Sequence, residues 1–143
     1  MDITKTLYTQ VADSDQPFPY CQVHFWKQKS QMDFIWKGKD ISTTEMREGQ
    51  YLSLEVMNGQ HFQFMLIDLA EFNCNWVSEL EWIKEMWFPE LSKTGVKKVG
   101  VVMPENLFSQ IATEQFAASF KSVFPEVQLS LFTSRIKAGL WLV

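Results

Sequence analysis

The stretch His61-Phe-Gln-Phe-Met-Leu-Ile-Asp-Leu69 is nearly continuously apolar from Phe64 to Leu69. A short apolar run of this kind is typical of a strand in the middle of a sheet, with both of its faces covered. Such strands occur in α/β proteins, where helices alternate with parallel strands. The segments on either side of the run therefore decide whether the chain has that architecture.

The segment before the central run carries the signals of a helix. Ser42-Thr-Thr-Glu45 has the form of a capping box, in which a hydroxyl accepts from a free backbone N–H and a carboxylate reaches back from three residues on. Asn58-Gly59 supplies a left-handed stop. A helix is therefore predicted from about Thr43 to Met57.

The segment after the central run predicts a second helix. Ser78-Glu-Leu-Glu81 again has the form of a capping box, and the helix is expected over about Glu79–Ser92. Apolar residues at three- and four-residue spacing form its core stripe. They are Leu80, Ile83, Trp87 and Leu91.

The rest of the C-terminal half continues the alternation. Residues 96–103 and 127–132 are rich in β-favouring residues and are predicted to be strands. A helix is expected between them over Glu105–Phe124, and Ser134 is expected to cap a short last helix. The helix over 105–124 is expected to bury Phe108, Ala112, Phe116, Phe120 and Phe124. The last helix carries Leu140, Trp141 and Leu142.

The N-terminal part predicts a hairpin. Cys21–Trp26 alternates apolar and polar residues, a polar turn follows, and Met32–Lys37 is a second strand. Residues 1–19 are expected to form an arm and a loop, with a short strand around Ile3–Thr9. The whole order is a β-hairpin followed by α-β-α-β-α-β-α. This order predicts the α/β class, with a parallel section of sheet, an antiparallel edge and a single domain over residues 20–143.

Composition excludes several classes of function. The net charge of −4 and a pI near 5.2 argue against a nucleic-acid partner, which would need a basic surface. No stretch reaches the roughly 18 uninterrupted apolar residues of a membrane span. With two cysteines and no apolar run at the N-terminus, the sequence indicates a soluble cytoplasmic protein without a disulfide framework.

Several short motifs, taken in order, carry a resemblance to a known family. They are Ile35-Trp-Lys-Gly38, Leu66-Ile-Asp-Leu69, Ser78-Glu-Leu-Glu-Trp-Ile83, Lys97-Lys-Val-Gly-Val-Val-Met-Pro104, Leu107-Phe-Ser-Gln110, Leu131-Phe132 and Leu140-Trp-Leu142. Over roughly residues 20–142 the chain resembles the SpoIIAA-like group of STAS domains (sulphate-transporter and anti-sigma-factor-antagonist), particularly small stand-alone bacterial members. The resemblance implies a SpoIIAA-like mixed sheet with helices on one side and no metal or organic cofactor.

The resemblance also implies a regulatory function. Members of the family switch a partner protein or bind small apolar or anionic ligands. In the anti-sigma-factor antagonists the switch is a serine within an Asp-Ser-Ser-Gly motif at the start of the helix after the central strand. The corresponding segment here is Asn75-Trp-Val-Ser-Glu79, which has one hydroxyl, Ser78, and no following glycine.

Two polar residues are candidate site residues. Ser78 is either a phospho-acceptor at a helix N-terminus or a plain N-cap, and Glu81 three residues on favours the cap. Asp68 lies at the C-terminal end of the central strand, where ligand sites of α/β sheets gather. A strand-end aspartate that accepts hydrogen bonds from the following backbone is the preferred interpretation.

The tryptophans suggest binding surfaces. Trp82 lies nearly opposite the core stripe of its helix, with Met86 one turn on, and either this pair or the hairpin edge is a candidate interface for a homodimer. Cover by the N-terminal arm or the last helix is the alternative. Trp26 and Trp36 are expected on facing strands of the hairpin, where they either pack across it or line a ligand pocket; cross-strand packing is preferred.

Catalytic and metal motifs are absent from the sequence. Cys21 and His24 stand three apart on a predicted strand and so point to opposite faces, while His61 and Cys74 are isolated. No phosphate-binding glycine loop, nucleophile elbow or zinc-protease motif occurs. An enzyme is therefore the third hypothesis. The first is a non-catalytic, STAS-like regulatory or protein-interaction module. The second is a sensor of a small apolar or anionic ligand, with an aromatic-lined pocket near the sheet–helix junction.

Overall fold

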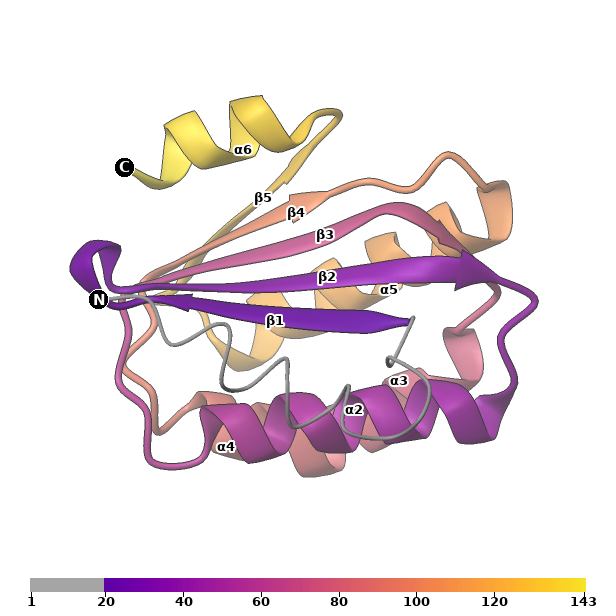
Figure 1. Ribbon diagram of the computed structural model, residues 1–143, viewed down its shortest axis with the longest axis horizontal. Helices are drawn as coiled ribbons and strands as arrows, with labels where there is room; N and C mark the ends of the chain where they lie inside the picture. The colour runs from indigo at the N-terminus through magenta and orange to yellow at the C-terminus, as the bar shows by residue number, and fades with distance from the viewer. Residues whose placement is uncertain (1–19) are drawn as a thin grey trace.

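The computed structural model describes residues 20–143, which form a mixed sheet of five strands. The strands are β1 (Cys21–Trp26), β2 (Gln31–Lys39), β3 (Phe64–Asn73), β4 (Lys98–Val102) and β5 (Gln128–Phe132). β1 pairs antiparallel with β2, and the other pairs are parallel, in the spatial order β1-β2-β3-β4-β5 (Figure 1). The predicted α/β class, the hairpin edge and the central strand are confirmed. The arm at 1–19 and its strand around Ile3–Thr9 lie outside the described residues.

The helices follow the parallel strands along the chain, and all except the last one, α6, connect one strand to the next. They are α2 (Thr43–Met57), the joined segments η2 (Val77–Glu79), α3 (Leu80–Trp82), η3 (Ile83–Trp87) and α4 (Phe88–Leu91), then α5 (Leu107–Val123) and α6 (Arg135–Leu142). A short 3₁₀ turn, η1 (Lys27–Lys29), joins β1 to β2. Each strand lies beside its predecessor in the chain, so the connections all move in one direction across the sheet.

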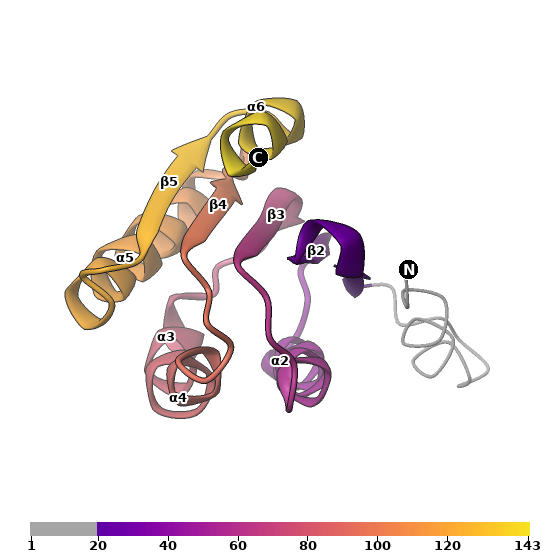
Figure 2. The ribbon, with the colours of Figure 1, turned by 90° about the vertical axis from the view of Figure 1, so that its left-hand side faces the viewer.

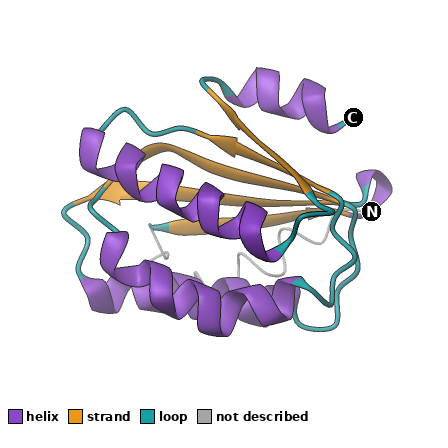
Figure 3. Cartoon of the chain, turned by 180° about the vertical axis from the view of Figure 1, so that it is seen from behind, coloured by secondary structure: helices purple, strands orange, loops and turns teal. Residues whose placement is uncertain are grey.

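The helices form two layers around the sheet. α2, the α3–α4 segment and α5 cover one face, and α6 lies on the other (Figures 2 and 3). The alternation of β3 serves both layers: Met65 and Ile67 belong to the large core under the first three helices, whereas Leu66 packs with Ala138 and Leu142 of α6. The central apolar run is thus covered on both faces, as its sequence predicted.

The ends of α2 lie where the sequence placed them. Glu45 N donates to Ser42 Oγ and Ser42 N donates to Glu45 Oε1, both over 3.1 Å, which completes the capping box. Asn58 ends the helix, and Gly59 follows with a φ of 76°, a conformation that costs glycine little. The predicted range of Thr43 to Met57 is confirmed.

The predicted capping box at Ser78 is wrong. Ser78 lies inside the 3₁₀ turn η2 and is exposed, and no side chain caps either η2 or α3. The chain instead turns before Ser78, where Asn75 Oδ1 accepts a hydrogen bond from Val77 N over 3.3 Å. Because the 3₁₀ turn begins before the serine, the hydroxyl is not at the first free N–H groups.

The predicted core stripe of α5 is wrong at its first member. Phe108 is 60% exposed, while Ala112, Phe116 and Phe120 are buried. Four residues span 400° of helix, so each i+4 step rotates by about 40° and a series of five drifts off any one face. The buried face is centred instead on a line that includes Ser109, and Phe108 lies to its side.

Candidate functional site

A cavity of about 70 Å³ lies between the sheet and the helices α2, η3 and α5. Its walls are apolar and aromatic, and include Trp36 of β2, Phe72 of β3, Trp76 of the following loop and Trp87 of η3. All of the lining residues are buried except Trp36, which is partly exposed. The aromatic-lined pocket that the ligand-binding hypothesis required is therefore present at the sheet–helix junction.

Trp36 and Gly49 shape one end of the cavity. The indole of Trp36 packs on Phe72, with 5.4 Å between ring centroids, near the carboxyl ends of β2 and β3. A Cβ atom at Gly49 would lie 2.5 Å from the Cη2 atom of Trp36, closer than atoms pack. Glycine on this face of α2 therefore allows the indole to lie directly against the helix.

Polar residues of α2 face the same space. Gln50 and Ser53 are buried and line the cavity, although both stand on the helix face that packs against the sheet. Trp87 Nε1 donates to Ser53 Oγ over 3.0 Å, and Ser53 Oγ donates to the backbone oxygen of Gln50 over 2.7 Å. Trp87 closes a π-helical turn that begins at Ile83, and both of these residues line the cavity. Single π turns are frequent at functional sites.

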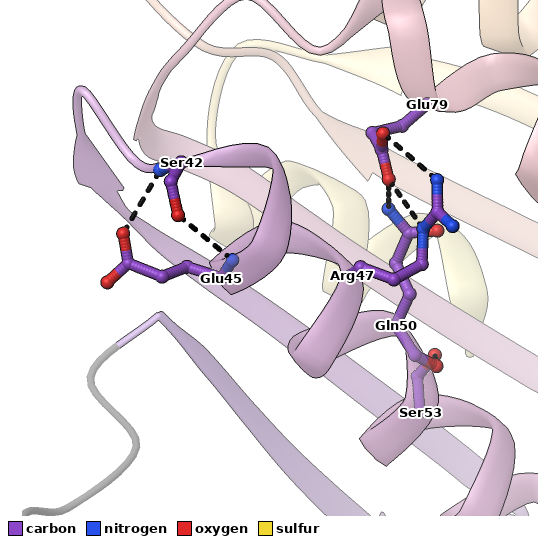
Figure 4. Close-up of polar contacts among 6 residues, drawn as sticks. All are labelled: Ser42, Glu45, Arg47, Gln50, Ser53 and Glu79. Carbon is purple, nitrogen blue, oxygen red and sulfur yellow. Dashed lines mark hydrogen bonds and ion pairs between the residues drawn. The ribbon is translucent and has the colours of Figure 1, made fainter.

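The buried carboxylate of Glu79 binds the two residues of α2 next to and within the cavity wall, Arg47 and Gln50. Glu79 is 1% exposed and accepts from Arg47 Nε over 2.9 Å, from Arg47 Nη2 over 3.3 Å and from Gln50 Nε2 over 3.1 Å (Figure 4). Arg47 also lies over the ring of Trp82, 4.8 Å from its centroid. The three donors compensate the buried charge and fix the orientation of the Gln50 amide.

Two buried polar atoms of the cavity wall have no hydrogen-bond partner among the described residues: Gln50 Oε1 and Trp76 Nε1. The orientation of the Gln50 amide follows from chemistry, since the carboxylate of Glu79 only accepts and must face the NH₂ group. A buried polar atom without a partner costs about 1–3 kcal/mol. The side chains that line the cavity thus include one unpaired acceptor and one unpaired donor among mostly apolar groups.

A second polar cluster occupies the opposite face of the sheet. Asp33 is buried and accepts from Trp26 Nε1 over 2.9 Å and from Gln31 Nε2 over 2.8 Å. Arg135 of α6 reaches Asp33 at 3.6 Å and Asp68 at 3.9 Å. Asp68 also accepts from Ala70 N over 3.0 Å, as the sequence favoured, but its predicted place at the end of the strand is wrong because β3 continues to Asn73. The cluster holds α6 against the strands β2 and β3.

The residues suggested as one ligand site are divided between the two faces. Trp36 lines the cavity, whereas Trp26 and Asp68 belong to the cluster on the α6 side. The preferred packing of Trp26 on Trp36 across the hairpin is wrong. The register pairs Trp26 with Gln31 and Trp36 with Cys21, so the two indoles are at opposite ends of the hairpin.

The suggested interface residues differ from each other in exposure. Trp82 is partly buried between Arg47 and Tyr51, whose ring lies 5.3 Å from it in a T-shaped contact. Among the described residues its cover therefore comes from α2 and not from the last helix, and the arm lies outside those residues. Met86 is 45% exposed and Tyr51 is 54% exposed, so an apolar patch remains beside Trp82.

Metal binding finds no cluster of ligands in residues 20–143. No group of three or more His, Cys, Asp and Glu side chains there could hold a metal ion. Cys21 faces the core and His24 the opposite side, as the strand alternation predicted. Both cysteines are free, and burial raises the pKa of the Cys21 and Cys74 thiols, which keeps them protonated. In this part of the chain no helix has the length and apolar character needed to cross a bilayer.

The residues that carry the cavity chemistry are Gln50, Trp76 and Glu79, none of which the sequence singled out. A signal for Gln50 does exist: it stands in the buried stripe of α2 together with Met46, Ser53 and Met57. A glutamine within an apolar stripe must find buried partners. No local pattern marks Trp76 or Glu79: Glu79 is bonded by a helix about 30 residues earlier, and Trp76 packs on Phe116 of a later helix. Comparisons with protein-family models, curated proteins and solved structures find no match to this chain.

Proposed function

We propose that the chain is a non-catalytic binding module that takes a small, largely apolar ligand into the cavity beneath Trp36. The observation that carries the proposal is the wall itself, where Gln50 Oε1 and Trp76 Nε1 are buried and unpaired. Protein cores are close-packed and pair their polar atoms, so a cavity with both features is the exception that a ligand site explains.

The ligand hypothesis is tested with matched cavity variants. Xenon and neutral compounds of up to four heavy atoms should raise the melting temperature of the wild type, because a ligand that binds only the folded state stabilises it. Leu69→Phe fills the cavity and should abolish the shift, whereas Leu52→Phe, outside the lining, should retain it. Equal shifts in the two variants, or none in the wild type, would contradict the proposal.

A STAS-like regulatory module is the second candidate. The order of elements, with a hairpin edge followed by parallel strands in sequence order, supports a SpoIIAA-like fold. The position of α6 on the second face departs from the one-sided helices that the resemblance implies. The switch serine is represented only by Ser78, which is exposed and accessible to a kinase but lacks a helix-capping role. Membership of the family and a bacterial, cytoplasmic setting stay proposals.

The apolar patch beside Trp82 favours partner binding for this second candidate. Tyr51 and Met86 are exposed on adjacent helices and could form the centre of a homodimer contact. Met86→Glu tests this idea better than a change at Trp82, which packs inside the chain. Sedimentation should show a dimer for the wild type and a monomer for Met86→Glu. A wild-type monomer, or an unchanged dimer in the variant, would reject the self-association.

A further inference from the structure

We infer that the ligand of the cavity is a neutral, compact group with one hydrogen-bond donor and one acceptor, of the carboxamide or alcohol type. The inference rests on the proposed ligand-binding function and names the chemical class of the ligand. It is carried by the two unpaired polar atoms of the wall, Gln50 Oε1 and Trp76 Nε1.

The acceptor of the site is fixed by the carboxylate behind it. Glu79 accepts from Gln50 Nε2 over 3.1 Å, and this bond turns Oε1 of the same amide to the remaining side. Gln50 is only 7% exposed, so bulk water does not supply a hydrogen-bond partner for this oxygen. An N–H or O–H group of a ligand would satisfy this oxygen.

The donor of the site is an indole. Trp87, also in the wall, has its Nε1 bonded to Ser53 Oγ, and this leaves Trp76 as the buried indole of the lining whose N–H is unpaired. Trp76 is 7% exposed and packs on Phe116 at 6.0 Å between ring centroids. A carbonyl or hydroxyl oxygen of a ligand would accept from it.

The electrostatics of the wall favour a neutral ligand. The lining contains no charged side chain among the described residues, and the nearby charge of Glu79 is already compensated by Arg47. An anion would find one unpaired indole N–H and no cation, and a cation would find one amide oxygen. Either ion would lose its hydration without adequate compensation.

The size of the cavity restricts the ligand to a few heavy atoms. An apolar cavity of about 150 Å³ holds benzene, so about 70 Å³ holds three or four heavy atoms. Trp36 is the partly exposed member of the wall, which makes it the place where a larger molecule would extend outward. A terminal primary amide therefore fits as well as a small free amide.

Three planar probes of four heavy atoms test the chemistry: acetamide, acetone and isobutene. Each is titrated into the full-length ¹⁵N-labelled chain, and the indole and side-chain amide resonances are followed by NMR. Acetamide, with both functions, should shift the signals of Trp76 and Gln50. It should bind about tenfold more tightly than acetone, which leaves the amide oxygen unpaired, and isobutene should bind most weakly.

Variants separate this inference from the ligand-binding proposal itself. Trp76→Phe should reduce the preference for acetone over isobutene about tenfold, and Trp141→Phe, on α6, should leave that preference unchanged. If isobutene binds as tightly as acetamide while Leu69→Phe abolishes both, the module stands but the ligand class is wrong. If no probe shifts Trp76, the cavity holds water only, and the ligand class and the proposed function both fail.

Discussion

At the scale of single residues, Glu79 is the most deeply buried charged group among the described residues. It is 1% exposed, whereas its partner Arg47 keeps about a third of its side chain in solvent. The two ends of this ion pair are therefore unequal. Removal of the arginine leaves a buried charge behind, but removal of the carboxylate leaves a guanidinium that can turn into water.

This inequality predicts different costs for the two ends. Arg47→Met should lower the free energy of unfolding by about 3 kcal/mol, because Glu79 stays buried with one donor from Gln50. Glu79→Gln should cost less, about 1–2 kcal/mol. Urea denaturation of both single variants and the double variant gives the coupling free energy between Arg47 and Glu79. Equal costs, or a double variant that equals the sum, would show that the pair is not coupled as described.

Glu45 predicts a pH dependence. The hydroxyl of Tyr20 donates to its carboxylate, and this bond, with the backbone N–H of Ser42, lowers the pKa of Glu45 below its ordinary value of 4.5. The unfolded chain therefore takes up a proton at higher pH than the folded chain does. The stabilisation is present above pH 4.5 and is lost as the pH falls through the folded pKa.

Glu45→Gln should flatten the stability profile below pH 4.5, measured by urea denaturation between pH 3 and 6. Glu48→Gln makes the same change of charge at an exposed position of the same helix and should leave that slope in place. An unaltered slope in Glu45→Gln would mean that the bond to Tyr20 does not contribute to folding.

The same scale shows what local sequence can specify. The box of Ser42 and Glu45 was predictable because both partners lie within one turn of helix. Ser78 carried the same four-residue pattern, but the chain turns before it and the pattern is not used. Glu79 stood beside it without any signal, since its donors are 29 and 32 residues away.

At the scale of elements, the position of α2 on the sheet depends on a glycine, whereas its ends depend on its caps. Gly49 lies in the middle of the helix, where alanine would usually be better by about 1 kcal/mol. Its Cβ would overlap the six-membered ring of Trp36, and the Trp36 indole also packs on Phe72. The close approach of sheet and helix at the cavity therefore requires glycine.

Gly49→Ala should lower the free energy of unfolding by about 1–3 kcal/mol and shift the Trp36 fluorescence. Gly139→Ala is the matched control, because a Cβ there meets nothing within 4 Å and the residue is also helical. The control should gain about 0.5–1 kcal/mol. Stabilisation by both substitutions would show that Trp36 moves aside without cost.

α5 gives a second prediction at this scale. Phe116→Ala should cost about 3–5 kcal/mol, because the ring is buried against Trp76, Trp87 and Phe88. Phe108→Ala, at an exposed position of the same helix, should change stability by less than about 0.5 kcal/mol. Thermal and urea unfolding measure the stability of both variants. Comparable losses of stability at the two positions would mean that Phe108 is part of the core.

Element boundaries were predicted best where caps and period agree. The range of α2 was right at both ends, since a capping box and an Asn-Gly stop bracket it. The π turn at Ile83–Trp87 was missed, because the spacing of its apolar residues is the same as in an α-helix. The error at Phe108 came from extending an i+4 series over too many turns.

At the scale of the whole molecule, alternation fixed the topology. A hairpin followed by alternating helices and strands leads to the observed strand order, because short connections keep successive strands adjacent. The face that α6 covers was not predictable, since it depends on Arg135 reaching Asp33 and Asp68 across the sheet. The apolar character of Leu66 and Val102 shows only that something covers that face.

The cavity is also a property of the whole molecule. Its walls come from β2, β3, the loop at Trp76, α2, η3 and α5, so no single segment encodes it. A high content of aromatic residues predicts either a dense core or a lined pocket, and composition does not separate the two. Here the chain forms a lined pocket, with Trp36 packed on Gly49 and Gln50, one residue on, in the wall.

Analysis of the small molecules that the protein carries tests the ligand-binding account most directly. Wild type, Leu69→Phe and Leu52→Phe are purified under native conditions from the source organism, and the compounds released on unfolding are identified by mass spectrometry. We expect one small neutral compound to be enriched in the wild type and in Leu52→Phe, and to be lost from Leu69→Phe. Identical small-molecule contents in the three preparations would contradict a ligand site between Gln50 and Trp76.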